Sequence, residues 1–310
     1  MTDARAMVAD GPVHLPTQAT EVAALIRESA AGGRALRIRG AGTWMEAGHS
    51  VRAAATLALD AMRGIVGYRP DDLTISVGAG TTLAELDDAT RAHGQWCPLL
   101  SWGDDTGTVG ATVATATSGP FVERLGRPRD LVLGLECVDG TGRVIAAGGR
   151  VVKNVAGFDL TRAVTGSWGT LAVITQLHLR LRARPAVDET WALTLPGAED
   201  AAMHDFTRGH CAPIATLAVG DADANALALG GARWLVRLGG NAAFVAAARD
   251  ALRALGHAVA TDPAVWDDVR TRLAPQARAS HWRWDALSLR LRERFDPARV
   301  LNPGLLGEPA

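Results

Sequence analysis

The first 185 residues alternate short apolar segments with glycine-rich turns. Residues 21–30 (EVAALIRESA) carry apolar side chains at helical spacing, which predicts an amphipathic helix. Residues 35–39 then alternate as a short buried strand does, and they end in the turn Gly40-Ala41-Gly42-Thr43. Residues 55–60 (ATLALD) predict a further strand.

The same pattern continues to the end of this region. Residues 64–80 predict two strands around a Pro-Asp-Asp turn, and Thr81 or Thr82 can cap a following helix that has Glu85 in its first turn. Residues 130–149 predict a hairpin with an Asp-Gly-Thr-Gly turn, and residues 169–185 a long closing strand.

The pattern changes from about Val187. The apolar segments WALTL, IATLAV, ALALGG, RWLVRLGG and HAVA are interleaved with helical stretches at residues 198–209 and 241–255. They predict a small α+β unit of roughly 75 residues, a common size for a small domain. A last helical stretch, residues 285–295, leads into DPARVLNPG. We therefore expect three parts, residues 12–185, 186–280 and 281–310.

Composition narrows the class of protein. Hydrophobic residues make up 48% of the 310 residues and charged residues 21%, as in a folded chain with a sizeable core. The net charge of -1 does not indicate a nucleic-acid partner or a basic membrane anchor. Cys97, Cys137 and Cys211 show neither disulfide nor metal spacing, which favours a reducing compartment. Without a signal peptide or an apolar run of about 18 residues, the expected location is cytoplasmic, with any membrane contact made through partner subunits.

Glycine clusters suggest a phosphate-binding site, but neither common device fits. Residues 40–45 begin like a dinucleotide fingerprint and have Met45 at the third glycine position, and residues 78–83 fail in the same way. Lys153, the only lysine in the chain, is followed by Asn154 rather than by the Ser or Thr of a Walker A loop.

Two loops whose backbone N–H groups converge on one diphosphate are the remaining option. Loop one is Arg39–Thr43, and loop two is residues 106–119, in which Ala and Thr alternate with glycine. Ordinary tight turns are the alternative interpretation.

The order of several segments resembles the FAD-binding domain of the vanillyl-alcohol-oxidase-like (PCMH-type) flavoproteins, and within it the FAD-binding E subunits of glycolate oxidases. The segments are RIRGAGT, GTVGATVATATSGP, RDLVLGLECVDGTG, KNVAGFDLTRAVTGSWGTLAVIT and FDPARVLNPG. The resemblance covers about residues 12–185 and the last 20 or so. It implies an α+β fold with a two-subdomain FAD-binding domain and a small ferredoxin-like cap inserted before the C-terminal helix, which returns to the FAD domain.

The resemblance also implies which residues bind FAD. They are Arg39, Gly40, Ala41, Gly42 and Thr43 of loop one; Thr106, Gly107, Gly110, Ala111, Ala114, Thr115 and Gly119 of loop two; and Gly169, Thr170, Leu171, Val173, Ile174 and Asn302. Ala172 replaces a glycine that is usual in the family. Lys153 lies in a matching KNxxGYDL-like segment, where we hypothesise a positive charge near the flavin or its phosphates; survival by chance on a solvated turn is the alternative.

Covalent flavin attachment and metal binding are not expected. Some relatives attach FAD through a histidine in loop one, whereas here that position is Thr43-Trp44 and His49 lies further on. Catalytic relatives carry a metal-binding histidine cluster in a large cap, but the short cap here has no histidines in ligand spacing. We expect non-covalent FAD and no metal, and we assign no catalytic residue.

Two functions from different classes follow. The first is an FAD-carrying subunit of a glycolate-oxidase-type 2-hydroxy acid dehydrogenase complex, inactive alone, with a larger catalytic flavoprotein and an iron–sulfur subunit as partners. The second is a stand-alone FAD-dependent oxidoreductase for a small alcohol or hydroxy acid. A structural subunit with a decayed FAD site is a third interpretation, and the intact loop glycines count against it.

Overall fold

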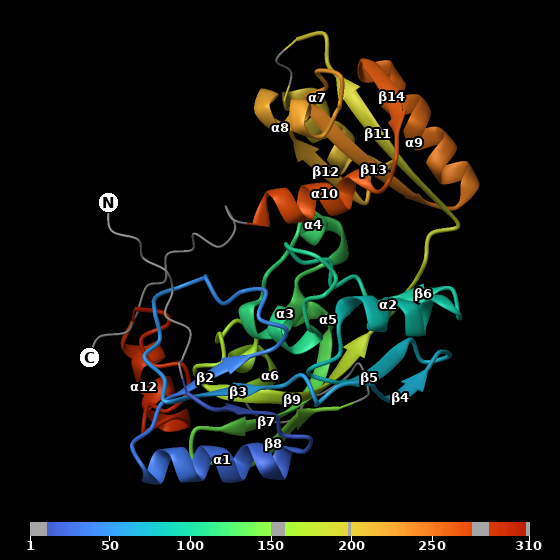
Figure 1. Ribbon diagram of the computed structural model, residues 1–310. Helices are drawn as coiled ribbons and strands as arrows, with labels where there is room; N and C mark the ends of the chain where they lie inside the picture. The colour runs from blue at the N-terminus through green and yellow to red at the C-terminus, as the bar shows by residue number, and fades with distance from the viewer. Residues whose placement is uncertain (1–10, 150–158, 198–199, 275–284, 308–310) are drawn as a thin grey trace, which may run out of the picture.

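The computed structural model describes residues 11–149, 159–197, 200–274 and 285–307. They form a lower unit, built from residues 11–185 and the C-terminal segment, and an upper unit built from residues 187–274 (Figure 1). Both units mix helices and strands, which confirms the expected α+β class. Lys153 lies outside the described residues.

The first half of the lower unit contains a small parallel sheet. Its strand order is β1 (Val13–His14), β3 (Ala55–Ala58), β2 (Leu36–Arg39), and α1 (Ala19–Ala31) connects β1 to β2. Val22 and Ile26 of α1 are fully buried, so the amphipathic pattern of residues 21–30 packs as predicted.

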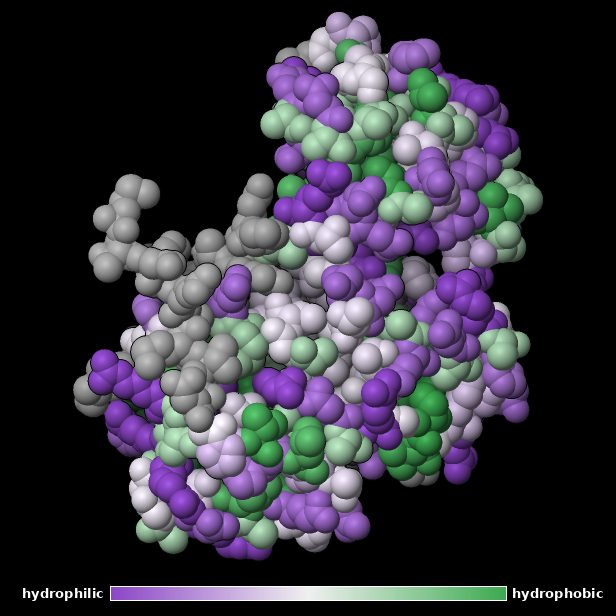
Figure 2. All heavy atoms as spheres, in the orientation of Figure 1, coloured by the Kyte–Doolittle hydropathy of each residue, from purple (hydrophilic) through white to green (hydrophobic). Residues whose placement is uncertain are grey.

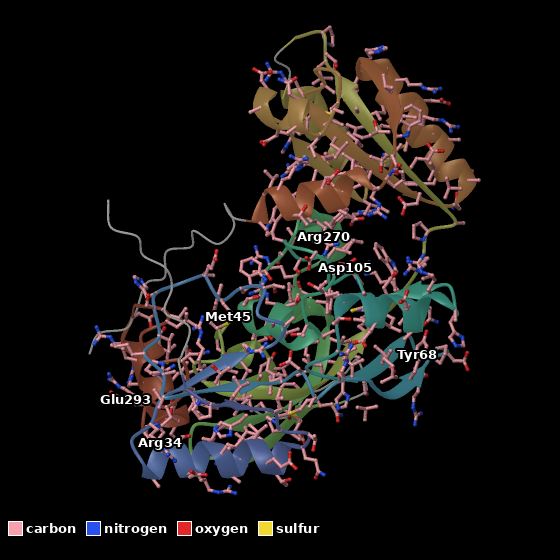
Figure 3. All side chains as sticks on the ribbon, viewed as in Figure 1. Arg34, Met45, Tyr68, Asp105, Arg270 and Glu293 are labelled. Carbon is pink, nitrogen blue, oxygen red and sulfur yellow. The ribbon has the colours of Figure 1, made fainter. Side chains whose placement is uncertain are left out.

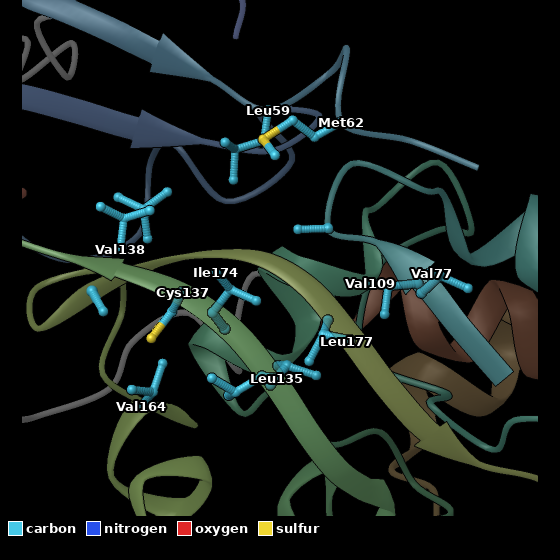
Figure 4. Close-up of a cluster of buried hydrophobic side chains, with 14 of the residues drawn as sticks. Leu59, Met62, Val77, Val109, Leu135, Cys137, Val138, Val164, Ile174 and Leu177 are labelled. Carbon is cyan, nitrogen blue, oxygen red and sulfur yellow. The ribbon is translucent and has the colours of Figure 1, made fainter. Parts of the chain in front are cut away.

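A five-stranded antiparallel sheet forms the second half. Its order is β4 (Ile65–Arg69), β5 (Thr74–Gly78), β9 (Ala172–Arg180), β7 (Val132–Asp139), β8 (Val144–Gly148). The β7–β8 hairpin is confirmed, and the backbone N–H groups of Thr141 and Arg143 donate to the Asp139 carboxylate in its turn. Apolar side chains from β5, β7, β9 and the neighbouring helices form the core, part of which is shown in Figure 4.

Short helices connect these strands. They are α2 (Leu83–Arg91), α3 (Val109–Thr115), α4 (Val122–Leu125), α5 (Pro128–Leu131) and α6 (Leu160–Val164). Thr82 and Glu85 form a reciprocal capping box at the start of α2, as the sequence predicted. The pair β6 (Gln95–Trp96) and β10 (Arg182–Ala183) ends the lower unit where the chain leaves it.

The upper unit is a four-stranded antiparallel sheet with helices on both faces. The strand order is β12 (Ala215–Ala218), β13 (Trp234–Gly240), β11 (Val187–Thr194), β14 (His257–Thr261). Together with α7 (Asp200–Arg208) and α9 (Ala242–Leu255), this gives the expected ferredoxin-like β-α-β-β-α-β arrangement. The segment ALALGG is not a strand, because α8 (Asp221–Ala226) and turns occupy it.

The two units share a hydrophobic contact. Trp96, Phe121 and Leu125 of the lower unit belong to the same buried cluster as Leu235 and Trp266 of the upper unit. Trp266 lies on α10 (Val265–Arg272), which runs between the upper sheet and the lower unit (Figure 1). The upper unit is therefore fixed by buried side chains as well as by the chain connection.

The last helix, α12 (Ala286–Phe295), returns to the lower unit. The buried Arg292 guanidinium donates to the carbonyl oxygens of Thr170 and Leu301, at 2.6 and 2.7 Å. Leu301 in turn forms a parallel bridge with Leu36 of β2. The chain after residue 286 thus extends the wall of the small parallel sheet.

On the face seen in Figure 2, hydrophilic residues dominate both units and apolar residues are scattered among them. Within the described ranges, no helix has both the length and the apolar character required to cross a bilayer.

Candidate functional site

A cleft opens in the lower unit between loop one, α3 and the start of β9. Its empty space, including the open mouth, is about 650 Å³. The lining residues are Arg37, Ile38, Arg39, Gly40, Gly42, Thr43, Trp44, Met45, Leu59, Gly110, Ala111, Ala114, Thr115, Trp168, Gly169, Ala172, Val173, Ile174, Asn302 and Leu305. Twelve of these are residues that the sequence analysis expected to bind FAD, so the fold brings most of that set together.

Loop one reaches the cleft because two of its residues are glycines. A Cβ added to Gly40 would lie 2.2 Å from Thr108 Oγ1 and 3.3 Å from Ala111 Cβ, so only glycine allows this close approach to α3. Gly42 has φ +87°, a backbone conformation that residues with a side chain rarely adopt. These two positions place the backbone of loop one on the cleft wall.

The backbone N–H groups of the two loops differ in availability. In loop one, the N–H groups of Gly40, Ala41 and Gly42 form no hydrogen bond with other described residues. At the start of α3, the N–H groups of Val109 and Gly110 donate to Thr81 and Ala79, 2.8 and 2.9 Å away.

The next two backbone N–H groups of α3 also donate to protein acceptors. The N–H group of Ala111 donates to Thr108 Oγ1, and that of Thr112 donates to the Thr108 carbonyl oxygen. Residues 109–115 form a helix whose first N–H groups already have protein acceptors, so this part of loop two offers few free amides to a diphosphate. That both loops bind the diphosphate stays a prediction.

The turn after α6 forms the opposite wall. Trp168 has φ +55°, and its backbone N–H donates to the Ala114 carbonyl oxygen at 2.8 Å. The Asn302 side chain holds this turn against β2, since its Nδ2 donates to Trp168 O and its Oδ1 accepts from Ile38 N. Both ends of that amide are used within the protein, so Asn302 shapes the wall.

The charged residues of the cleft wall are both arginines. Arg39 pairs with Asp60, with 3.3 Å between Nη2 and Oδ2, and also donates to Gly40 O. Arg37 is 7% exposed, and its Nη2 donates to the Met45 carbonyl oxygen at 3.2 Å. Burial lowers the pKa of Arg37 from its usual value. The wall therefore favours an anionic ligand.

Some expected residues lie elsewhere. Ala41, Thr106, Gly107, Gly119, Thr170 and Leu171 do not line the cleft. Thr106 bonds to Asp104, Thr170 Oγ1 donates to Ser167 O inside the protein, and a Cβ on Gly119 would meet Leu100 O at 2.2 Å. Gly119 instead borders a smaller hollow, about 220 Å³, between residues 98–100 and 117–119.

Several lining residues are not among those expected from the sequence. Arg37 alternates with Arg39 on β2, which is a pattern that could have identified it, and Trp168 lies within the recognised GSWGTL segment. Leu59 and Leu305 reach the cleft only through tertiary packing, so no local pattern indicates them. Ala172, named as a departure from the family, lines the cleft.

The remaining candidate nucleophiles and ligands are inert or dispersed. Burial raises the pKa of the Cys97 and Cys137 thiols to about 12, which leaves both protonated near neutral pH. His49 does not line the cleft; its backbone N–H donates to Leu305 O. Among the described residues, no group of three or more His, Cys, Asp or Glu could hold a metal ion.

A second cavity, which we call the interdomain hollow, lies between the two units. It has about 1050 Å³ of empty space and is lined by four arginines, of which Arg91 pairs with Asp87 at 2.6 Å. Arg184 pairs with Asp87, Arg237 with Asp188 at 2.6 Å, and Arg270 with Asp105 at 2.7 Å. Figure 3 shows Arg270 and Asp105 meeting across the boundary between the units. Each cation in this cavity has an acidic partner.

Comparison with known proteins relates part of the lower unit to FAD-binding proteins. Residues 12–148 match the FAD binding domain family. The chain is 39% identical over 132 residues to glycolate oxidase subunit GlcE of Escherichia coli, covering 42% of this chain and 37% of that protein. It is 34% identical over 187 residues to a D-lactate dehydrogenase of Archaeoglobus fulgidus, covering 60% of this chain and 42% of that protein. The matched parts thus span less than half the length of these relatives.

A solved structure shows the same fold. Alkyldihydroxyacetonephosphate synthase superposes with a TM-score of 0.68 at 17% identity, covering 84% of this chain and 55% of that one. The likeness extends into the upper unit, because it covers 84% of the chain and only about 72% of the chain (222 of 310 residues) lies outside residues 187–274. It confirms the expected fold class.

Proposed function

We propose that this chain is the FAD-carrying subunit of a glycolate-oxidase-type dehydrogenase complex for 2-hydroxy acids, because residues 12–148 match the FAD binding domain family. The observation that carries the proposal is the cleft of the lower unit, whose wall combines close-approaching glycines with arginines and no acid. The similarity to subunit GlcE supports the choice of complex.

The residues of the cleft fit FAD. Loop one presents three N–H groups without acceptors among the described residues, and the buried Arg37 carries positive charge beside them. Trp44 and Trp168 lie edge to face with ring centroids 6.1 Å apart, which gives an aromatic border to the same cleft. When bound, FAD supplies the capacity to accept electrons, and the protein supplies position and electrostatics.

The described part of the chain offers few groups suited to oxidising a hydroxy acid. Such a reaction requires a group that holds the carboxylate and a base that takes the hydroxyl proton. No histidine lines the cleft or the interdomain hollow among the residues that the structure describes, and the hollow's arginines are each paired with an aspartate. We therefore propose that turnover depends on a larger catalytic flavoprotein and an iron–sulfur subunit.

The second candidate is a stand-alone FAD-dependent oxidoreductase. The interdomain hollow favours it, because this cavity is large enough for a small molecule and is bordered by Trp96, Phe121 and Trp266. A small alcohol or hydroxy acid would be the substrate of such an enzyme.

One experiment separates the candidates. The purified chain is denatured to release and quantify flavin, and the native protein is assayed with glycolate and D-lactate using a dye acceptor. We expect bound, non-covalent FAD and no turnover by the isolated chain, with activity appearing once the partner flavoprotein and iron–sulfur subunit are added. Robust turnover by the chain alone would support the stand-alone enzyme, and a protein that cannot be reconstituted with FAD would contradict both.

A further inference from the structure

Arg37 is a buried cation that has no acidic partner among the described residues. It lies in the middle of β2, on the strand that leads into loop one, and 7% of its surface is exposed. One end of the guanidinium, Nη2, donates to the Met45 carbonyl oxygen. The other end, Nη1, is buried and forms no hydrogen bond within the described parts of the chain.

A buried, unpaired guanidinium lowers the stability of the folded protein unless a ligand pairs with it. Taking an unpaired charge out of water is strongly unfavourable, and buried cations in stable proteins are almost always paired. Arg39, two residues further on, has Asp60 as its partner. The other residues that line the cleft are uncharged. Within the described ranges no acidic side chain compensates the charge of Arg37, which favours an external anion as its partner.

The hydrogen bonds of the two loops indicate which anionic group of FAD would meet Arg37. The first N–H groups of α3 have protein acceptors, so they add little to binding a diphosphate. Loop one offers its N–H groups to one side of the cleft, and a guanidinium can add two parallel donors in a plane that matches phosphate oxygens.

We propose that Arg37 binds the diphosphate of FAD. Its guanidinium supplies donors and positive charge in place of the first N–H groups of α3, which already donate to protein acceptors. This inference rests on the proposed function only in placing FAD in the cleft. It assigns a binding role to a residue that the family resemblance had not indicated.

A purely structural role is the competing explanation. The bond from Arg37 to Met45 O could hold residues 44–47 over the strand, and its loss would then disturb the cleft for every ligand. The two roles predict different results for ligands with and without phosphate, and opposite results for the stability of the apoprotein.

The test uses the full-length apoprotein as wild type, Arg37→Met, Arg37→Lys and the control Arg34→Met. Arg34 is an exposed arginine of the same segment, paired with Glu28 outside the cleft. Dissociation constants are measured for FAD, ADP, riboflavin and adenosine by flavin fluorescence and calorimetry. We expect Arg37→Met to weaken FAD and ADP by the same factor, about 10- to 100-fold. Riboflavin and adenosine, which lack phosphate, should change less than about twofold, and Arg37→Lys should retain part of the affinity.

Stability gives a second readout. Removing an uncompensated buried charge should leave the Arg37→Met apoprotein at least as resistant to urea as wild type, while the rise in Tm that FAD produces becomes smaller. The inference is overturned if Arg37→Met binds FAD as wild type does, or if it loses all four ligands equally with a less stable apoprotein. A wild-type protein that fails to bind FAD would instead contradict the proposed function, which the inference presupposes.

Discussion

The cleft and the interdomain hollow both contain buried arginines, and they differ in how these charges are neutralised. In the hollow, Arg270 is 2% exposed and its guanidinium bonds to Ser101 O and to Asp105. In the cleft, Arg37 is almost as buried and has one carbonyl oxygen as its partner. The hollow is thus electrostatically complete without a ligand, whereas the cleft is not. This contrast indicates that Arg270 joins two parts of the protein, whereas Arg37 is placed to bind an anion.

The largest effect is expected on the hollow side. Arg270→Met removes the bonds to Ser101 O and Asp105, although Asp105 keeps access to water because its side chain is 46% exposed. The free energy of unfolding should fall by about 2–4 kcal/mol, with FAD affinity changed less than about twofold. Urea unfolding and FAD titration measure both. Arg233→Met, which removes an exposed pair with Asp221, is the control and should cost less than about 0.5 kcal/mol. A large loss of FAD affinity in Arg270→Met would contradict the separation of the two cavities.

Gly40→Ala tests the close approach of loop one to α3. The added Cβ would meet Thr108 Oγ1 at 2.2 Å, and Thr108 cannot move away without losing its cap on α3. We expect a loss of about 1–3 kcal/mol in stability and at least tenfold weaker FAD binding. Gly67→Ala is the matched control, because nothing lies within 4 Å of a Cβ there. Unchanged FAD affinity in Gly40→Ala would show that loop one does not form the binding wall.

Asp60→Asn should increase the uncompensated positive charge of the cleft, and so its difference from the hollow. Asp60 neutralises Arg39 at 3.3 Å, and both side chains are partly exposed. Its removal should strengthen FAD binding by about two- to fivefold, the equivalent of roughly 0.5–1 kcal/mol for a partly screened pair. Asp72→Asn, which removes an exposed partner of Arg69 in a distant turn, provides the control titration. Weaker FAD binding in Asp60→Asn would argue that Arg39 must be held by its carboxylate.

The smallest effect depends on pH and concerns the N-terminal cap of α2, the helix whose Leu83 and Leu86 line the hollow. The N–H group of Thr82 donates to the Glu85 carboxylate and lowers its pKa from the usual 4.5. A lowered pKa in the folded state stabilises the protein above the unfolded pKa, and this contribution is lost as pH falls through the folded value. Glu85→Gln should therefore make the free energy of unfolding less dependent on pH below about 4.5. At neutral pH the two proteins should differ by about 0.3 kcal/mol. Urea unfolding between pH 3 and 7 measures it, and identical slopes for both proteins would contradict the prediction.

Local patterns predicted much of the fold. The capping box of Thr82 and Glu85, the β7–β8 hairpin and the helix that starts after Asn241 all form as expected, because short-range hydrogen bonds determine them. α3 was missed, since glycine, alanine and threonine at residues 107–115 do not form a helical pattern. It forms because Thr108 caps it and because Val109 and Val113 are buried in the core.

The candidate site was predicted in part for a similar reason. Loop one depends on glycines that can be read locally, and twelve expected residues line the cleft. The state of a hydrogen-bonding group is a tertiary property, so the sequence did not show that the first amides of α3 are committed or that Arg37 has no acid beside it. Leu305 and Asn302 reach the wall from the far end of the chain, through contacts that no local spacing indicates.

The return of residues 300–305 to β2 has a consequence for how the protein is made. Val300, Leu301 and Asn302 bond to the strand that leads into loop one, yet they are synthesised after the whole upper unit. The wall of the cleft is therefore incomplete while the ribosome is translating residues 187–274. We expect the cofactor to be loaded only after this segment has been released, which makes the timing of translation part of how the flavoprotein matures.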